Sequence, residues 1–398
     1  MIDPSAYTLQ TGQALVSGLD AVVKAAAEYP GPARMAVAAG SRPGAWMVEA
    51  FRDREVLRRV GVELALTMAE RDAGVAAVEA WLGGAASILV AGAEGSGPAL
   101  AALHAWPTTG GERGAAVIAA CEEAEIDLWR AAARWTGRVL LEPADLQELK
   151  DWTALCLAGD ERNPGPTIVL APSRLRRSGA LVRCGFPQNK LGETQRAARA
   201  DPPSTGLDDI ASLPQLGETA PIGLASIGPA STVLRQALVE LGLAGRLPVF
   251  RAASVDRVDP QMWDRMRQRC QEIAVFDCGR DLASALRILS GVAQPASEAA
   301  GAALDTRSAH VLRGVYEVNP DRPADVAARV VELVRDHEAS SGEALRKLVR
   351  ARAEAVAIDP HRAGALDDDA TQPSPDRVNA QAGADPVPLR SSIGWLLR

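Results

Sequence analysis

Hydrophobic and polar positions follow two alternating periods along the first 180 residues. Between positions 60 and 67 every second residue is apolar, which is typical of a β-strand. Short, wholly apolar runs indicate further buried strands at 87–92, 115–120, 138–143 and 166–172. Between them the period becomes helical, over 68–82, 99–106, 124–135 and 145–157. Strands that alternate with helices predict a parallel sheet covered on both faces.

The same alternation returns after an irregular stretch. Residues 185–220 show no periodicity and contain many glycines and prolines, so they predict a linker. Beyond them come strands at 222–228, 247–252 and 272–277, with helices at 230–242, 260–270, 323–336 and 342–357. The pattern therefore predicts an α/β chain with two doubly wound domains, at 1–184 and 221–357.

Both ends of the chain leave alternatives open. The eighteen residues before Pro30 predict one amphipathic helix, which Tyr29-Pro30-Gly31-Pro32 ends. That turn is either a plain helix terminator or a rigid loop that brings backbone close to a ligand. Residues 358–398 predict a disordered tail, because 359–388 are polar, acidic and proline-bearing. The apolar tip SSIGWLLR is either a docking peptide or a helix that folds back on its own domain.

Composition narrows the class of protein. Of the 398 residues, 47% are hydrophobic and 23% charged, an ordinary globular profile. The net charge of −7 and the isoelectric point near 5.4 argue against a nucleic-acid surface. No apolar run is long enough to cross a bilayer and the N-terminus lacks the pattern of a signal peptide, so we expect a cytoplasmic protein without membrane contact.

Common metal and nucleotide motifs are missing from the sequence. The five cysteines form no CxxC pair and the four histidines are scattered, so we expect free thiols and no metal site carried by this chain alone. There is no Walker A motif and no GxSxG. The loop GAEGSGP (92–98) lacks the third glycine of a dinucleotide-binding fingerprint.

Three strings of the first domain resemble one family. They are Tyr29-Pro30-Gly31, ERDAGVAAVEAWLGGAAS (70–87) and LEPADLQEL (141–149). In this order they resemble the α subunit of the thiamine-pyrophosphate-dependent 2-oxoacid:ferredoxin oxidoreductases, of indolepyruvate type. IGLASIGPASTVLRQAL (222–238) and RGVYEVNPDRPADVAARVVELV (313–334) resemble its second domain, so the likeness spans about 10–335.

The resemblance implies a pyrimidine-binding-like domain of thiamine-pyrophosphate enzymes followed by a transketolase C-terminal-like domain. The family's Gly-Asp-Gly metal motif and its cysteine-rich segment have no counterpart in this sequence. The resemblance therefore implies two partners, a pyrophosphate-domain subunit with Mg²⁺ and a ferredoxin-like subunit with 4Fe–4S clusters. Together they would decarboxylate a 2-oxoacid, such as indolepyruvate or pyruvate, and coenzyme A would usually accept the acyl group.

Glu70 is the catalytic and cofactor-binding candidate that the resemblance implies. A carboxylate there would hydrogen-bond the aminopyrimidine ring of thiamine pyrophosphate, and a dry pocket would strengthen that bond. The spacing Thr67-Met68-Ala69-Glu70 also fits a helix capping box, which needs no cofactor. In LEPADLQEL, we expect Pro143 to end a strand and Asp145 to cap the following helix.

The resemblance places further residues around Glu70. Gly31, Ser96 and Gly97 would contact the cofactor, although the loop that holds the last two is also an ordinary strand–helix turn. Tyr29, Pro32 and Arg34 would face the substrate. Pro32 replaces a family threonine that contacts substrate, and Arg34 could instead hold a substrate carboxylate or point to solvent.

These departures keep two other functions open. One is a non-catalytic scaffold or regulatory relative that has lost the site. The other is a thiamine-dependent decarboxylase or lyase without a redox step.

Overall fold

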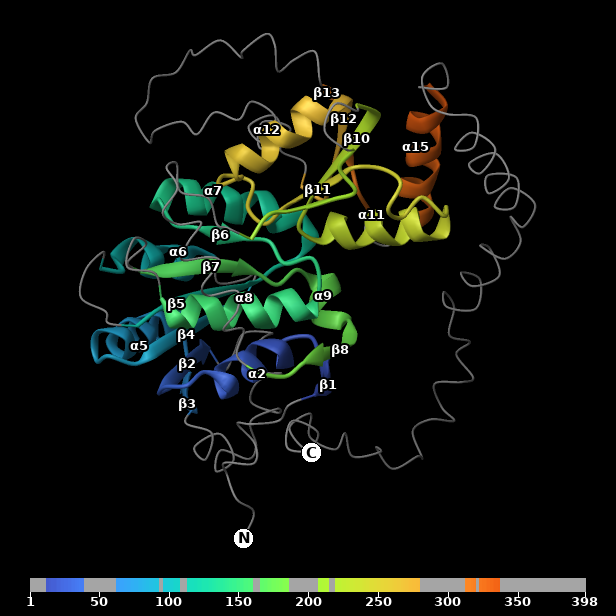
Figure 1. Ribbon diagram of the computed structural model, residues 1–398. Coiled ribbons are helices and arrows are strands. Elements are labelled where there is room, and N and C mark those ends of the chain that lie inside the picture. Colours follow the sequence, from blue (N-terminus) through green and yellow to red (C-terminus); the bar gives the residue numbers. More distant parts are fainter. Residues whose placement is uncertain are drawn as a thin grey trace, which may run out of the picture.

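The computed structural model describes residues 12–38, 62–92, 96–107, 113–159, 165–185, 207–214, 219–279, 312–319 and 322–336. Two mainly parallel sheets, one in each half of the chain, dominate these residues (Figure 1). The predicted helix 342–357 and the tail 358–398 lie outside the described residues.

The first sheet contains six parallel strands in the order β3-β2-β4-β5-β7-β6. Their bounds are β2 Ala33–Ala38, β3 Val62–Thr67, β4 Ala86–Gly92, β5 Ala115–Ala120, β6 Leu140–Leu141 and β7 Pro166–Leu170. Every residue of β4 and β5 is buried, which explains their uninterrupted apolar sequences. The strand β2, which the sequence pattern did not predict, lies between β3 and β4.

Helices cover both faces of this sheet. α5 (Glu70–Leu82), α6 (Ser96–Ala105) and α7 (Ile126–Thr136) pack on one face, where Trp81, Trp106 and Trp129 meet the side chains of alternate strand residues. α2 (Asp20–Glu28) and α8 (Leu146–Ala158) pack on the other, with Trp152 in its core. Two short helices follow strands β5 and β7, namely η2 (Glu123–Glu125) and α9 (Ser173–Arg177).

The helix predicted over the residues before Pro30 is wrong in its first part. β1 (Gln13–Ser17) pairs antiparallel with β8 (Gly179–Arg183), and α2 begins only at Asp20. Val16 is buried while its neighbour Leu15 is exposed, as in a strand. Gly18 separates the two elements at a φ of +48°, and the carbonyl of Arg176 occupies the space that a Cβ would need.

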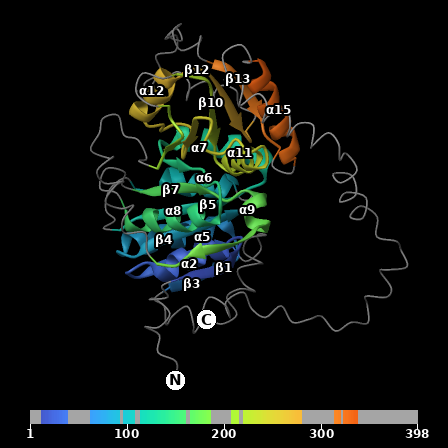
Figure 2. The same cartoon turned by 45° about the vertical axis from the view of Figure 1, so that its right-hand side comes forward.

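The second sheet has the order β13-β12-β10-β11-β9. Four strands are parallel: β10 Ala220–Ile227, β11 Val249–Ala252, β12 Cys270–Asp277 and β13 Leu312–Glu317. The edge strand β9 (Asp209–Ala211) runs antiparallel to β11. α11 (Pro229–Glu240) and α15 (Pro323–Asp336) pack together on one face, and α12 (Pro260–Arg269) packs on the other (Figure 2).

The two doubly wound α/β units predicted from the periodicity are thus confirmed. Part of the predicted linker 185–220 belongs to the second sheet, because residues 209–211 form β9 and Ala220 begins β10. Residues 186–206 and 215–218 of this linker lie outside the described residues. Among the described helices, none combines the length and the apolar character needed to cross a membrane.

Candidate functional site

Glu70 lies at the carboxyl edge of the first sheet. It is the first residue of α5, directly after the edge strand β3, and its side chain is half-buried. Its Oε1 accepts a hydrogen bond of 3.3 Å from the backbone N–H of Gly92, the last residue of β4. Because β2 lies between β3 and β4, this bond crosses the carboxyl end of β2. In open α/β sheets this edge is where ligands bind.

The capping-box interpretation of Glu70 is wrong. α5 has Ala69, not Thr67, as its N-cap residue, and no side chain caps it. The hydroxyl of Thr67 donates to the carbonyl of Ala69 at 2.8 Å. The carboxylate therefore stands at a helix N-terminus, where the aligned peptide dipoles favour negative charge, and it contacts a neighbouring strand.

Ser96 and Gly97 reach the same edge of the sheet. They open α6, which follows β4 and therefore begins near the residue that binds Glu70. Gly97 is exposed, and a Cβ at this position would meet nothing within 4 Å. Crowding therefore does not require glycine here.

Tyr29, Gly31, Pro32 and Arg34 lie at the opposite edge. They lie just before β2 or in its first residues, and therefore at the amino end of that strand. The hydrogen bond between Glu70 and Gly92 lies at the other end of β2, its carboxyl end. The structure does not bring them together with Glu70. Arg34 pairs with Glu63 of the neighbouring strand at 3.4 Å.

A close side-chain contact lies at the glycine of the Tyr29–Pro32 turn. The guanidinium of Arg113 occupies the position that a Cβ of Gly31 would take. The backbone carbonyl of Arg113 in turn accepts a 2.7 Å bond from the indole N–H of Trp81. The backbone of this turn is thus approached closely by a side chain of the same chain.

The string LEPADLQEL forms a strand end and a capped helix, largely as predicted. Asp145 is the N-cap of α8, and its Oδ1 accepts from the N–H of Glu148 at 3.0 Å. Glu148 Oε2 accepts from the N–H of Ala144 at 2.8 Å, one residue before the cap. β6 ends at Leu141 rather than at Pro143.

Sequence analysis missed a buried charge cluster at the other end of the sheet. Arg130 of α7 contacts Glu142, which follows β6, and Asp277, which ends β12. The side chains of these three residues are at most 2% exposed. The signal in the sequence was an arginine on the apolar side of a helix, at helical spacing from Ile126 and Ala133.

Burial and pairing act against each other in this cluster. Burial opposes the charge of Arg130, yet the two carboxylates raise its pKa well above the usual value. Burial also raises the pKa of Glu142, and the adjacent guanidinium offsets only part of that effect.

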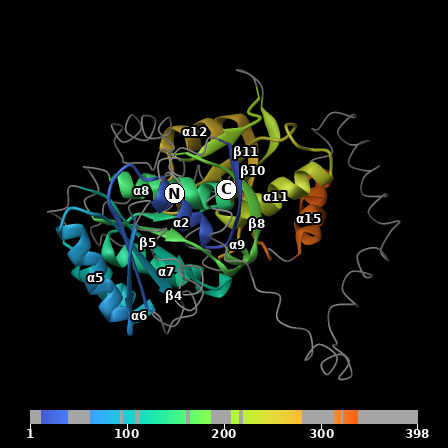
Figure 3. The same ribbon diagram turned by 90° about the horizontal axis from the view of Figure 1, so that it is seen from below.

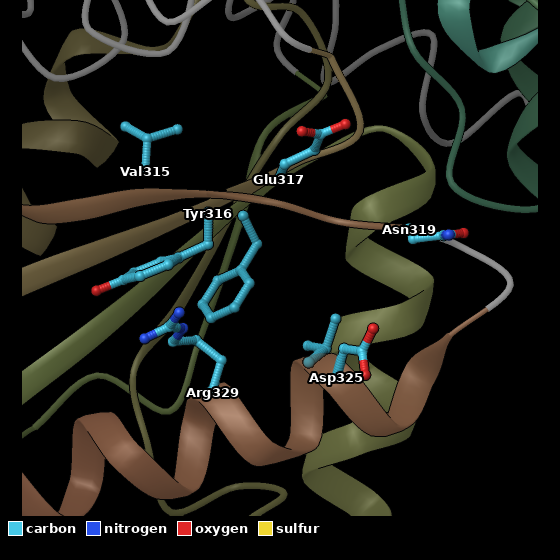
Figure 4. Close-up of a pocket in the computed structure, with 8 residues that line it drawn as sticks. Val315, Tyr316, Glu317, Asn319, Asp325 and Arg329 are labelled. Carbon is cyan, nitrogen blue, oxygen red and sulfur yellow. The ribbon is translucent and has the colours of Figure 1, made fainter.

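A hollow of about 420 Å³ opens in the second sheet, at the ends of β12 and β13 and the start of α15 (Figure 4). The guanidinium of Arg329 lies 4.8 Å over the ring of Tyr316, and Glu317 and Asp325 are among the other residues that line the hollow. None of the predicted site residues lines it. Within the described ranges, no group of three or more His, Cys, Asp or Glu side chains could hold a metal ion.

Comparisons with known proteins show the fold. No family model and no curated protein matches the sequence. Among solved structures, a 2-oxoglutarate:ferredoxin oxidoreductase from Magnetococcus marinus, with 2-oxoglutarate, coenzyme A and succinyl-CoA bound, is similar with a TM-score of 0.57 and 14% identity. The match covers 81% of this chain and 66% of that chain. A split-gene transketolase, an inactive β4 tetramer, matches with a TM-score of 0.47 and 16% identity, over 83% of this chain and 97% of that one. The chain thus shares a two-domain α/β fold with this 2-oxoglutarate:ferredoxin oxidoreductase.

Proposed function

We propose that this chain is the aminopyrimidine-side subunit of a thiamine-pyrophosphate-dependent 2-oxoacid:ferredoxin oxidoreductase, of indolepyruvate type. The observation that carries the proposal is the position of Glu70, at the carboxyl edge of a sheet of this fold and bound to the end of β4. The string LEPADLQEL and the likeness to a solved oxidoreductase support the same class.

The residues at this edge suit the pyrimidine half of the cofactor. The carboxylate of Glu70 can accept a hydrogen bond from a protonated ring nitrogen, and partial burial strengthens such a bond. Ser96 and Gly97 begin a helix at the same edge and would contact the ring system. Thiamine pyrophosphate supplies, when bound, an acidic carbon that adds to a 2-oxoacid and a sink for the electrons released with CO₂.

Within this proposal Glu70 holds and orients a proton. The N–H of Gly92 donates to one carboxylate oxygen, which fixes the rotation of the carboxylate about its side chain. A carboxylate fixed in this way keeps a proton shared with the pyrimidine ring and favours the tautomer that the chemistry needs. The groups that bind pyrophosphate and Mg²⁺ would come from a partner subunit, and 4Fe–4S clusters on a further partner would accept the electrons.

Affinity purification of the chain from its own cells tests the partner arrangement. Mass spectrometry is expected to find a stoichiometric partner with a Gly-Asp-Gly motif, and cysteine clusters on that partner or on a third chain. A chain that purifies alone, or with partners without these motifs, contradicts the proposal and favours a scaffold role.

The purified complex then tests Glu70. Reduction of a low-potential dye is measured with a panel of 2-oxoacids, with and without thiamine pyrophosphate and coenzyme A. Glu70→Gln is expected to lower the rate by about 10²-fold or more. Glu79→Gln, an exposed change on the same helix, should leave it unaltered. Equal rates for the two variants, with both folded, would show that Glu70 is not catalytic. Decarboxylation without dye reduction would indicate a lyase.

A further inference from the structure

The string at residues 141–149, here called the docking segment, contacts the second unit through its backbone. The N–H of Glu142 donates to the carbonyl of Ala253, which follows β11, at 2.8 Å. The hydroxyl of Thr232 on α11 donates to the carbonyl of Ala144 at 2.6 Å. These two bonds join the loop between β6 and α8 to the first turn of α11 and to the residue after β11, within one βαβ unit of the second sheet.

Side chains of the docking segment add ion pairs to the same surface. Glu148 pairs with Arg251 of β11, whose guanidinium also lies 4.9 Å over the ring of Trp152. Asp145 is 3.4 Å from Arg235 on α11. The first of these pairs is largely buried, whereas the second is exposed to solvent and contributes less.

Arg130 donates five hydrogen bonds, two of which cross to the second unit. Its Nε and Nη2 donate to Glu142 at 3.0 and 2.7 Å, and its Nη2 and Nη1 donate to Asp277 at 2.8 and 2.7 Å. Nη1 also donates to Asp127 at 3.3 Å. A guanidinium has five N–H donors, so all of them are used. Asp277 belongs to the second sheet, whereas Arg130 and the other two carboxylates belong to the first unit.

Two glycines of the second unit let the cluster pack directly against its backbone. A Cβ on Gly228, which precedes α11, would lie 3.0 Å from Cβ and 3.3 Å from Oε2 of Glu142. A Cβ on Gly279 would clash with the Arg130 guanidinium and lie 2.7 Å from Asp127 Oδ1. Gly228 also places the N-terminus of α11 against the Glu142 carboxylate, where the helix dipole favours its charge.

We propose that the docking segment and the Arg130 cluster (Arg130, Glu142, Asp277 and Asp127) lock the two sheets in one relative orientation, with their carboxyl ends facing. Glu142 follows β6, while Gly228, Ala253 and Asp277 mark the carboxyl ends of three strands of the second sheet. An apolar interface of the same area tolerates sliding, because its contacts have no direction. The two hydrogen bonds from Arg130 to Asp277 have a fixed direction and do not tolerate sliding, and the three bonds to Glu142 and Asp127 hold the guanidinium in place within the first unit.

The proposed lock fixes the relative orientation of the two units, and this role differs from a contribution to the stability of the fold. Replacement of a buried ionic cluster by apolar side chains of similar volume is often neutral or stabilising. The triple variant Arg130→Met, Glu142→Leu, Asp277→Leu is therefore expected to keep or raise the melting temperature while the two units lose their fixed orientation. This inference does not depend on the proposed activity.

Distances between two spin labels test the lock. Val75→Cys on α5 and Val239→Cys on α11 place the labels on exposed positions of the two units. Cys184→Ser removes the one native thiol that is not buried. Double electron–electron resonance on the full chain is expected to give one narrow distance distribution. The triple variant should broaden it about twofold or more, and Arg329→Met, an exposed change on α15, should not.

A narrow, unchanged distance distribution in the folded triple variant overturns the proposed lock. A broad distribution in the labelled protein without the triple substitution overturns it as well. If the triple variant does not fold, Arg130→Lys decides. It keeps the charge but loses the planar fork, so broadening supports the lock and an unchanged distribution refutes it.

Discussion

Arg130→Met removes the cation from a buried cluster and leaves its carboxylates in place. In the wild-type protein Glu142 and Asp277 each receive two hydrogen bonds from Arg130, and the three side chains are almost fully buried. Methionine fills much of the same space without donating. Two buried carboxylates would then face each other without their shared counter-charge.

The expected loss of stability is large. Breaking a buried ionic contact by removal of one partner costs about 3–5 kcal/mol, because an uncompensated charge remains inside the protein. For a chain of this size that loss lowers the melting temperature on the order of 10 °C. Exposed ion pairs contribute about 1 kcal/mol or less, so the control Arg329→Met should change stability little.

The loss should depend on pH with a defined sign. Burial already raises the pKa of Glu142, and without the opposing effect of Arg130 it is expected to lie further above the value in the unfolded chain, which is about 4. A carboxyl group with a raised folded pKa binds protons more tightly in the folded state. Its contribution to stability is therefore complete below the unfolded pKa and is lost as the pH rises through the folded pKa. The deficit of Arg130→Met should be smaller at pH 5 than at pH 8.

Urea unfolding followed by tryptophan fluorescence measures both effects, with wild type and Arg329→Met in parallel. The melting temperature gives a second reading of each variant. This expectation is contradicted if Arg130→Met lowers the free energy of unfolding by less than about 1 kcal/mol at pH 8, or if the loss is not smaller at pH 5. Either result would show that the carboxylates of the cluster are exposed to water or do not depend on Arg130.

Three further experiments, two with substitutions and one with a thiol reagent, test the local structure. Asp145→Ala removes the side-chain cap of α8 and should lower the free energy of unfolding by about 1 kcal/mol in urea. Burial raises the pKa of Asp208 to about 6 although it accepts bonds from two backbone N–H groups. Because that pKa lies above the unfolded value, the free energy of unfolding of wild type should fall by about 2 kcal/mol relative to Asp208→Asn as the pH rises from 4 to 7. An equal pH dependence of the two free energies of unfolding would contradict this. A thiol reagent at pH 8 should react with Cys184 in the native protein, and with the four buried cysteines only after unfolding in urea. Burial keeps those thiols from the reagent, and it raises the pKa of Cys156 and Cys270 to about 12, so that little reactive thiolate forms.

The alternating architecture was predictable because buried parallel strands are short apolar runs, whereas the helices between them have an apolar stripe. The strand β2 was missed because the Tyr29–Pro32 turn precedes it directly and Arg34 interrupts its apolar residues. β1 was taken for the start of a helix, since five residues are too few to separate a period of two from one of 3.6. β9 and β13 were missed because they are edge strands of the second sheet, and an edge strand needs fewer apolar residues than a central one.

The candidate Glu70 follows from a sequence string, but the arrangement of residues around it could not be predicted. A local motif does not say at which edge of a sheet it will lie. Once β2 follows the Tyr29–Pro32 turn, that turn must stand at the amino edge, away from Glu70. The bond from Arg130 to Asp277 joins residues 147 positions apart, and no periodicity links such residues.

The strand order of the first sheet sets the distance between Glu70 and the Arg130 cluster. Glu70 follows β3, at one end of the first sheet, and Glu142 follows β6, at the other. Five strand spacings separate them, about 24 Å across the sheet. α5 and α15 accordingly lie at opposite ends of the molecule (Figure 3).

This separation bears on what completes the Glu70 site. The second sheet docks through α7, β6 and α8, so its described contacts lie at the end of the first sheet that is remote from Glu70. Within the described residues the second unit therefore does not cover Glu70, which is consistent with the proposal that a partner subunit supplies the pyrophosphate-binding groups. The two proposals can therefore fail separately: substitutions at Arg130 test the orientation of the sheets, and substitutions at Glu70 test the chemistry.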